Sequence, residues 1–109
     1  MELLLTEGQA WLDEAIPARK IPSQSLLKSG ELLATKLRER AIDLSHDRAT
    51  EFSPDIELLH FIAAKVAFLV FGKDSVAGEV YEKDASYYLA FPSSASRSAD
   101  YLDFKQSLN

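Results

Sequence analysis

Residues 53–72, with the sequence SPDIELLHFIAAKVAFLVFG, decide the fold of this chain. Ser53 is a typical N-cap residue, and Pro54 suits the first helical position, where its missing backbone N–H does no harm. From residue 56 to residue 71 the side chains are apolar almost all round the predicted helix, and Gly72 is a typical C-cap. A helix without a polar side must be surrounded. In so short a chain, we expect neighbouring subunits to provide part of that cover.

Three more helices are predicted, two before this one in the chain and one after it. The first covers residues 5–16 and ends at a proline, and the second covers residues 24–44, with apolar residues at spacings of three or four. The last covers residues 74–91 and is stopped by Pro92. The short Gly-Lys turn before it makes it antiparallel to the central helix. We therefore predict an all-α fold, with a four-helix bundle-like domain over residues 1–92.

The C-terminal residues 93–109 are predicted to form a separate unit, a Ser-rich strap followed by an extended docking arm. The strap, SSASRS, has no side chain that would form a core, whereas the end of the chain carries aromatic and leucine side chains. Such side chains are unusual in a disordered terminus. The arm either folds back over its own helices or docks on a second protein, which would make it an assembly device.

The composition limits the class of function. The chain has 109 residues, which fits one domain, and it has no cysteine and a formal net charge of -5. This acidic balance argues against nucleic acid as the main ligand, because proteins that bind DNA neutralise its phosphates with clustered Lys and Arg. The most apolar stretch is shorter than a membrane span and carries charged residues. We expect a soluble protein with no membrane partner.

Few residues are candidates for metal or acid–base chemistry. Glu57 and His60 form an E-x-x-H pair one turn apart on the central helix, a spacing that di-iron four-helix proteins use to hold metal. With Glu31 from a paired chain they would make a small ferritin-like metal-binding protein, which stays open as an alternative. A polar patch at the start of a buried helix is the simpler interpretation. The sequence has no glycine-rich phosphate-binding loop and no nucleophilic residue within a strand–turn–helix motif. We therefore expect no enzyme activity, no cofactor and no metal.

Residues 54–91, PDIELLHFIAAKVAFLVFGKDSVAGEVYEKDASYYLAF, resemble the head–tail connector (adaptor) proteins of tailed bacteriophages. The likeness is carried by an apolar helix opened by a proline, a brief GKD break, and a last helix that ends in the aromatic pattern ASYYLAF, residues 85–91. It covers about the second half of the chain. The first half matches no family pattern.

The resemblance implies a structural virion protein, made in the host cytoplasm and assembled as a homo-oligomeric, dodecameric ring between the portal protein and the tail proteins. DNA would pass nearby without specific binding, which an acidic surface favours. A cytosolic helical adaptor or chaperone that captures a partner in an apolar groove is a further alternative. We expect partner contacts from the aromatic and leucine side chains of the central helix, the last helix and the arm: Phe68, Phe71, Tyr87, Tyr101, Leu102, Phe104 and Leu108.

Overall fold

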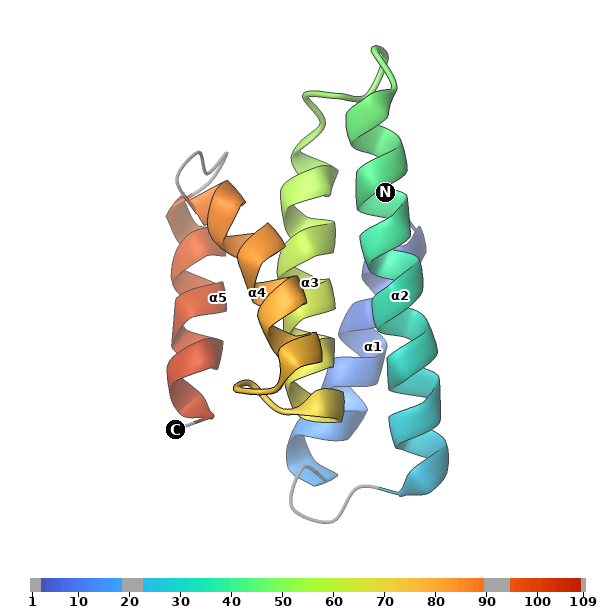
Figure 1. The fold of residues 1–109 in the computed structure, drawn as a ribbon, viewed down its shortest axis with the longest axis vertical. Coiled ribbons are helices and arrows are strands. Elements are labelled where there is room, and N and C mark those ends of the chain that lie inside the picture. The colour runs from blue at the N-terminus through green and yellow to red at the C-terminus, as the bar shows by residue number, and fades with distance from the viewer. Residues whose placement is uncertain (1–2, 19–22, 90–94, 109) are drawn as a thin grey trace.

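The computed structural model describes residues 3–18, 23–89 and 95–108, and these residues form five helices and no strand (Figure 1). The predicted all-α class is confirmed. None of the described helices is long and apolar enough to cross a membrane. The helices are α1 (Leu3–Ala18), α2 (Gln24–His46), α3 (Pro54–Phe71), α4 (Val76–Leu89) and α5 (Ala95–Ser107).

Helix α3 is the centre of the molecule, and each of the other helices packs against it. Figure 1 shows α2 and α4 running antiparallel to α3, while α1 and α5 run parallel to it. For α4 the ring contacts agree, since His60 in the first half of α3 stacks on Tyr88 near the end of α4, and Phe71 at the end of α3 stacks on Tyr81. The chain therefore goes up and down five times around one apolar helix.

The ends of α3 are set by the residues that the sequence singled out. The Ser53 hydroxyl accepts a hydrogen bond from the backbone N–H of Asp55, at 3.2 Å, and Pro54 begins the helix. At the other end Gly72 has φ +94°, a backbone conformation that favours glycine, and its N–H donates to the carbonyl of Phe68 at 3.0 Å. The predicted start and stop of this helix are confirmed.

Helices of this same chain supply most of the cover that α3 needs. Of residues 56–68, all except Leu58 are buried inside this single chain. Helix α2 lies along one side of α3 with its own buried stripe, which runs from Leu26 to Leu44 at helical spacing. Helices α1, α4 and α5 take the remaining sides, so most of the apolar helix is enclosed by other helices of the same chain.

The C-terminal segment differs from the predicted extended arm. Helix α5 begins at Ala95, so much of the Ser-rich stretch is helical, and the helix folds back onto α3. Tyr101 is fully buried and its ring lies 4.9 Å from that of Phe61, nearly parallel to it. Its burial also raises the pKa of the Tyr101 phenol. The predicted stop at Pro92 and the start of the strap lie outside the described residues.

Helices α1 and α2 are held together at a close contact between Trp11 and Gly30. The Trp11 indole N–H donates to the Leu26 carbonyl at 3.0 Å and to the Ser29 hydroxyl at 3.2 Å, which fixes the ring in place. The ring lies so near the α2 backbone that a Cβ atom at position 30 would overlap it, and would also overlap Val70 of α3. Gly30 thus allows α1, α2 and α3 to meet.

Replacing Gly30 is therefore expected to destabilise the protein, although alanine is the better helix former by about 1 kcal/mol. We expect Gly30→Ala to lower the free energy of unfolding by about 1–3 kcal/mol, the usual cost of overpacking, in urea denaturation followed by circular dichroism. Thr35→Ala, at an exposed position of the same helix, should change it by about 0.5 kcal/mol or less. A Gly30→Ala variant as stable as the wild type would contradict the tight contact.

Candidate docking groove between α1 and α5

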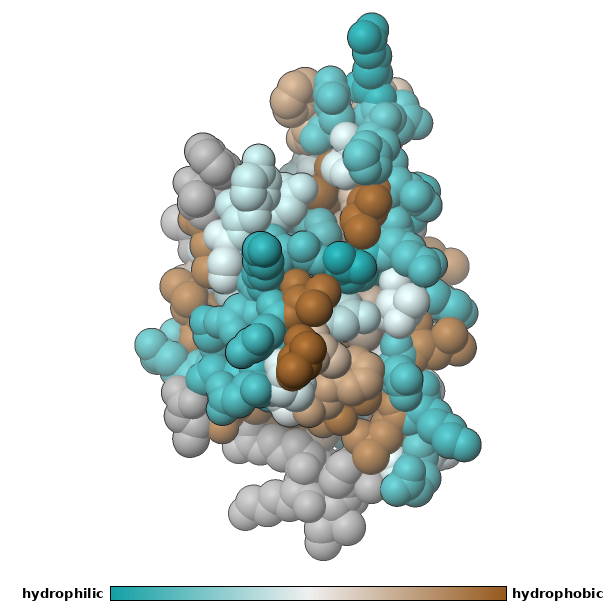
Figure 2. Space-filling model, in the orientation of Figure 1, coloured by the Kyte–Doolittle hydropathy of each residue, from teal (hydrophilic) through white to brown (hydrophobic). Residues whose placement is uncertain are grey.

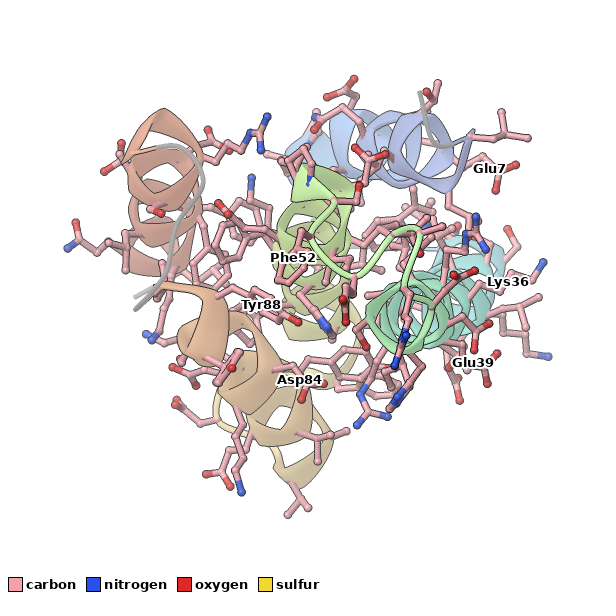
Figure 3. All side chains as sticks on the ribbon, turned by 90° about the horizontal axis from the view of Figure 1, so that it is seen from above. Glu7, Lys36, Glu39, Phe52, Asp84 and Tyr88 are labelled. Carbon is pink, nitrogen blue, oxygen red and sulfur yellow. The ribbon has the colours of Figure 1, made fainter. Side chains whose placement is uncertain are left out.

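An open groove runs along α3 on the side that lies between α1 and α5. Its main part has a volume of about 690 Å³, and a smaller hollow of about 260 Å³ adjoins it next to α5. Gln9, Leu58, Ile62 and Arg97 line both hollows, so the two form one groove. Seen from above in Figure 3, α1 and α5 lie on either side of α3. This is where the enclosure of α3 is incomplete.

The floor of the groove is apolar and its rim is polar. Leu58 and Ile62, one turn apart on α3, form the floor together with Leu5 of α1. The carboxylates of Asp13 and Asp55 lie at the rim. Leu58 is also the one residue of the 56–68 stretch that is not buried, which marks the place where apolar surface of α3 remains in contact with solvent.

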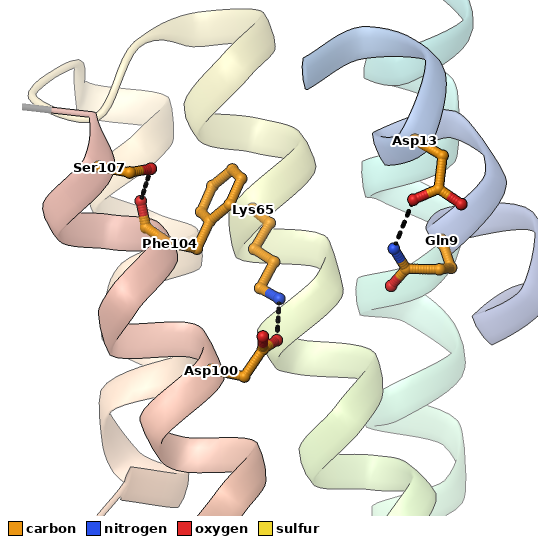
Figure 4. Close-up of polar contacts among 6 residues, drawn as sticks. All are labelled: Gln9, Asp13, Lys65, Asp100, Phe104 and Ser107. Carbon is orange, nitrogen blue, oxygen red and sulfur yellow. Dashed lines mark hydrogen bonds and ion pairs between the residues drawn. The ribbon is translucent and has the colours of Figure 1, made fainter. Parts of the chain in front are cut away.

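Polar contacts hold both walls of the groove (Figure 4). On α1, the Gln9 amide donates to an Asp13 carboxylate oxygen at 2.9 Å. On the α5 side, the Lys65 ammonium pairs with Asp100 at 2.6 Å and lies 5.4 Å from the centre of the Phe104 ring, within cation–π range. The Lys65 contacts join α5 to α3, and the Gln9–Asp13 bond orders side chains on the α1 wall. A partner would therefore meet a groove whose lining is already ordered.

The side chains expected to contact partners do not gather at one site. Phe68 and Tyr101 are buried in the core of this chain, so they do not face a partner in this fold. Tyr87 and Leu102 are exposed, on α4 and α5 respectively. The other three residues are half-buried and pack on the core from its edge: Phe71, Phe104 and Leu108.

The Glu57–His60 pair lies in the packing contact between α3 and α4. Both side chains are buried, and the His60 ring stacks on Tyr88 with 4.9 Å between ring centres. Beside them Arg38 of α2 forms an ion pair with Asp84 of α4, at 2.7 Å. Burial lowers the pKa of His60, Asp84 opposes that shift and Arg38 adds to it. The imidazole is therefore held neutral and serves as a flat ring in the contact between α3 and α4.

Nothing in the described residues brings metal ligands together. Glu31, which the ferritin-like alternative requires, is exposed on α2. No group of three or more His, Cys, Asp or Glu side chains in the described parts of the chain is placed to hold a metal ion.

A second apolar area lies on the face shown in Figure 2, where apolar side chains gather over α4 and between α4 and α2, among hydrophilic ones. Val76 and Val80 of α4 are exposed there, at 82% and 44%. A separate hollow of about 350 Å³ lies between α2, α3 and α4, and His60, Tyr87 and Tyr88 are part of its lining. Its lining is more polar than that of the α1–α5 groove, because Asp84 and Lys83 also border it.

The groove could not be located from the sequence. Its floor residues belong to a helix that is apolar on every side, so their pattern does not indicate which side stays open. That depends on α5, which the sequence pattern did not predict as a helix from Ala95. The polar positions Gln9 and Asp13, four residues apart on α1, are the one local signal that this side of α1 meets solvent.

Replacing His60 is expected to change how stability depends on pH. Its pKa in the folded chain lies below the ordinary 6.5, so the unfolded state binds the proton more readily. The contribution of His60 is therefore fully present above pH 6.5 and is lost as the pH falls through the lowered pKa. We expect His60→Gln to reduce the loss of unfolding free energy between about pH 7.5 and about pH 5, measured by urea denaturation.

His46 provides the matched control, because it is the other histidine of the chain and is exposed at the end of α2. His46→Gln should keep the wild-type pH profile. If the profiles of wild type and His60→Gln ran parallel, the buried imidazole would make no contribution and the assignment would be wrong.

No protein family matches this chain, and comparisons with curated proteins and with solved structures likewise found no match. The resemblance of residues 54–91 to head–tail connectors therefore stays a prediction from the sequence. The groove between α1 and α5 is the feature on which a function can be proposed.

Proposed function

We propose that this chain is a non-enzymatic structural subunit of a tailed-phage virion, a head–tail connector that links the portal protein to the tail. The observation that carries the proposal is the preformed apolar groove between α1 and α5, in a chain whose core is otherwise closed. The resemblance of residues 54–91 supports it from the sequence. The protein would be made in the host cytoplasm and end in the virion.

The groove suits an assembly role because it leaves apolar surface exposed to solvent, and the packing of the chain does not require this exposure. An apolar depression with a polar rim is typical of protein docking sites. Recognition of a helix in a groove uses this arrangement: an apolar ridge fills the floor and charged groups pair at the edge. Leu58 and Ile62 supply such a floor, and Asp13 supplies a charged edge.

The contacts proposed for a ring differ from those expected at first. Phe68 and Tyr101 are occupied within the chain, so subunit contacts would come from the groove and from the exposed Tyr87 and Leu102. The ring, its dodecameric number and its portal and tail partners remain part of the proposal. The net charge of -5 suits a position around passing DNA, because like charge repels the phosphates.

The same groove also fits a cytosolic adaptor or chaperone that captures the amphipathic helix of a partner. The two functions differ in the partner. A connector must bind a portal protein or a tail protein, whereas a chaperone would bind a client that is absent from the finished virion.

Binding to the portal protein encoded near this gene is therefore the test. We expect the purified chain to co-sediment with that portal in analytical ultracentrifugation. Gln9→Trp should weaken the complex, because Gln9 lines both parts of the groove and an indole there would take up space that the partner needs. Glu39→Trp places the same side chain at an exposed position of α2 and should leave binding intact (Figure 3).

Circular dichroism would show that both variants are folded. If the wild-type chain associates neither with the portal nor with the tail proteins, the connector proposal is wrong. Presence of the chain in assembly extracts but not in purified virions would favour the chaperone instead.

A further inference from the structure

We infer that the groove between α1 and α5 receives the side chain of Phe52 from a second copy of this chain. The inference rests on the proposed function, because it names the partner that occupies the same groove. Phe52 lies in the loop between α2 and α3 and is 91% exposed, more than any other large apolar side chain in the described residues. Figure 3 shows it at the start of α3.

The loop that carries Phe52 is held in a fixed shape. The Thr50 hydroxyl donates to the Leu44 carbonyl at 2.8 Å, which ties the loop to the end of α2. The Asp47 carboxylate accepts from the N–H of Ala49 at 2.9 Å, and the N–H of Ser53 donates to the Thr50 carbonyl, also at 2.9 Å. A loop anchored in this way loses little conformational freedom when it binds, so burying its exposed ring is favourable.

The chemistry of the loop complements that of the groove. The ring of Phe52 is apolar, as is the floor of the groove. The main part of the groove, with a volume of about 690 Å³, leaves room for a phenyl group and adjoining loop atoms. Arg48, in the same loop, is exposed and forms no ion pair with any described residue. The rim of the groove offers the carboxylates of Asp13 and Asp55. Glu51 stands directly beside Phe52, and Arg97 lines the groove as well, so the knob that Phe52 forms and the groove both carry charges of both signs around an apolar centre. The pairing that complements the apolar contact is that of Arg48 with Asp13.

The placement of the two features calls for a second copy. Phe52 borders the hollow on the α4 side of α3, together with Tyr87 and Tyr88. The groove opens on the side of α1 and α5. Because knob and groove lie on different sides of α3, one chain presents both to its neighbours. Repetition of such a contact links copies head to tail and closes into a ring when the rotation between copies allows it.

Sedimentation velocity on the full chain tests the contact. We expect the wild type to associate at about 200 µM, and Phe52→Ser and Gln9→Trp each to weaken this association by about tenfold or more, as for a buried aromatic anchor. Glu39→Trp should associate as the wild type does. Arg48→Glu and Asp13→Lys should each weaken association, and the double variant should regain it.

Mixing the two defective variants gives the sharpest result. Phe52→Ser chains retain an intact groove and Gln9→Trp chains retain an intact knob, so an equimolar mixture should form a complex although neither variant associates alone. A mixture that stays monomeric overturns the inference, and so does undiminished self-association of Phe52→Ser.

The connector proposal can survive such a failure. A wild-type chain that is monomeric alone yet binds the portal through the groove, with no effect of Phe52→Ser, would make the groove a site for a portal segment. That result would refute docking of a second copy and leave the proposed function standing.

Discussion

The structure depends on the burial of α3. Its side chains are apolar almost all round, so any stable fold of this chain must place protein on every side of the helix. Helices α2 and α4, its neighbours in sequence, pack antiparallel to it, and α1 and α5 at the two ends of the chain take the flanks. The groove between α1 and α5 is where this cover is incomplete, and it coincides with Leu58, which is half-exposed. Fold and candidate site therefore have the same origin.

Features with a local cause were predictable from the sequence. The caps of α3 at Ser53 and Gly72 act through their own backbone conformation and nearest hydrogen bonds, so residue type alone indicated them. The buried stripe of α2 follows from helical periodicity and was also predictable. The all-α class follows from these elements together.

Features with a tertiary cause were not predictable. The serines near the start of α5 favour loops when considered locally, and the helix forms there because Tyr101 stacks on Phe61 and Lys105 pairs with Glu82 of α4. The sequence likewise shows that α3 must be covered, but it does not show by which chain. Most of the cover comes from helices of this chain, and the exposed residues on the floor of the groove have no distinct sequence pattern.

Lys65 has a consequence for how α5 is placed. It is the only lysine or arginine of α3, and its ammonium is almost enclosed by the chain while Asp100 remains largely in solvent. Sliding α5 along α3 by one helical turn, about 5.4 Å, toward the C-terminal end of α5 would bring Arg97 to the level of the ammonium in place of Asp100. Such a displaced arrangement is penalised electrostatically even if the aromatic rings repack well. A slide in the opposite direction would offer Asp103 to the ammonium instead. A single internal charge thus disfavours displacement of α5 in one direction, which the apolar surfaces of the two helices alone would not do.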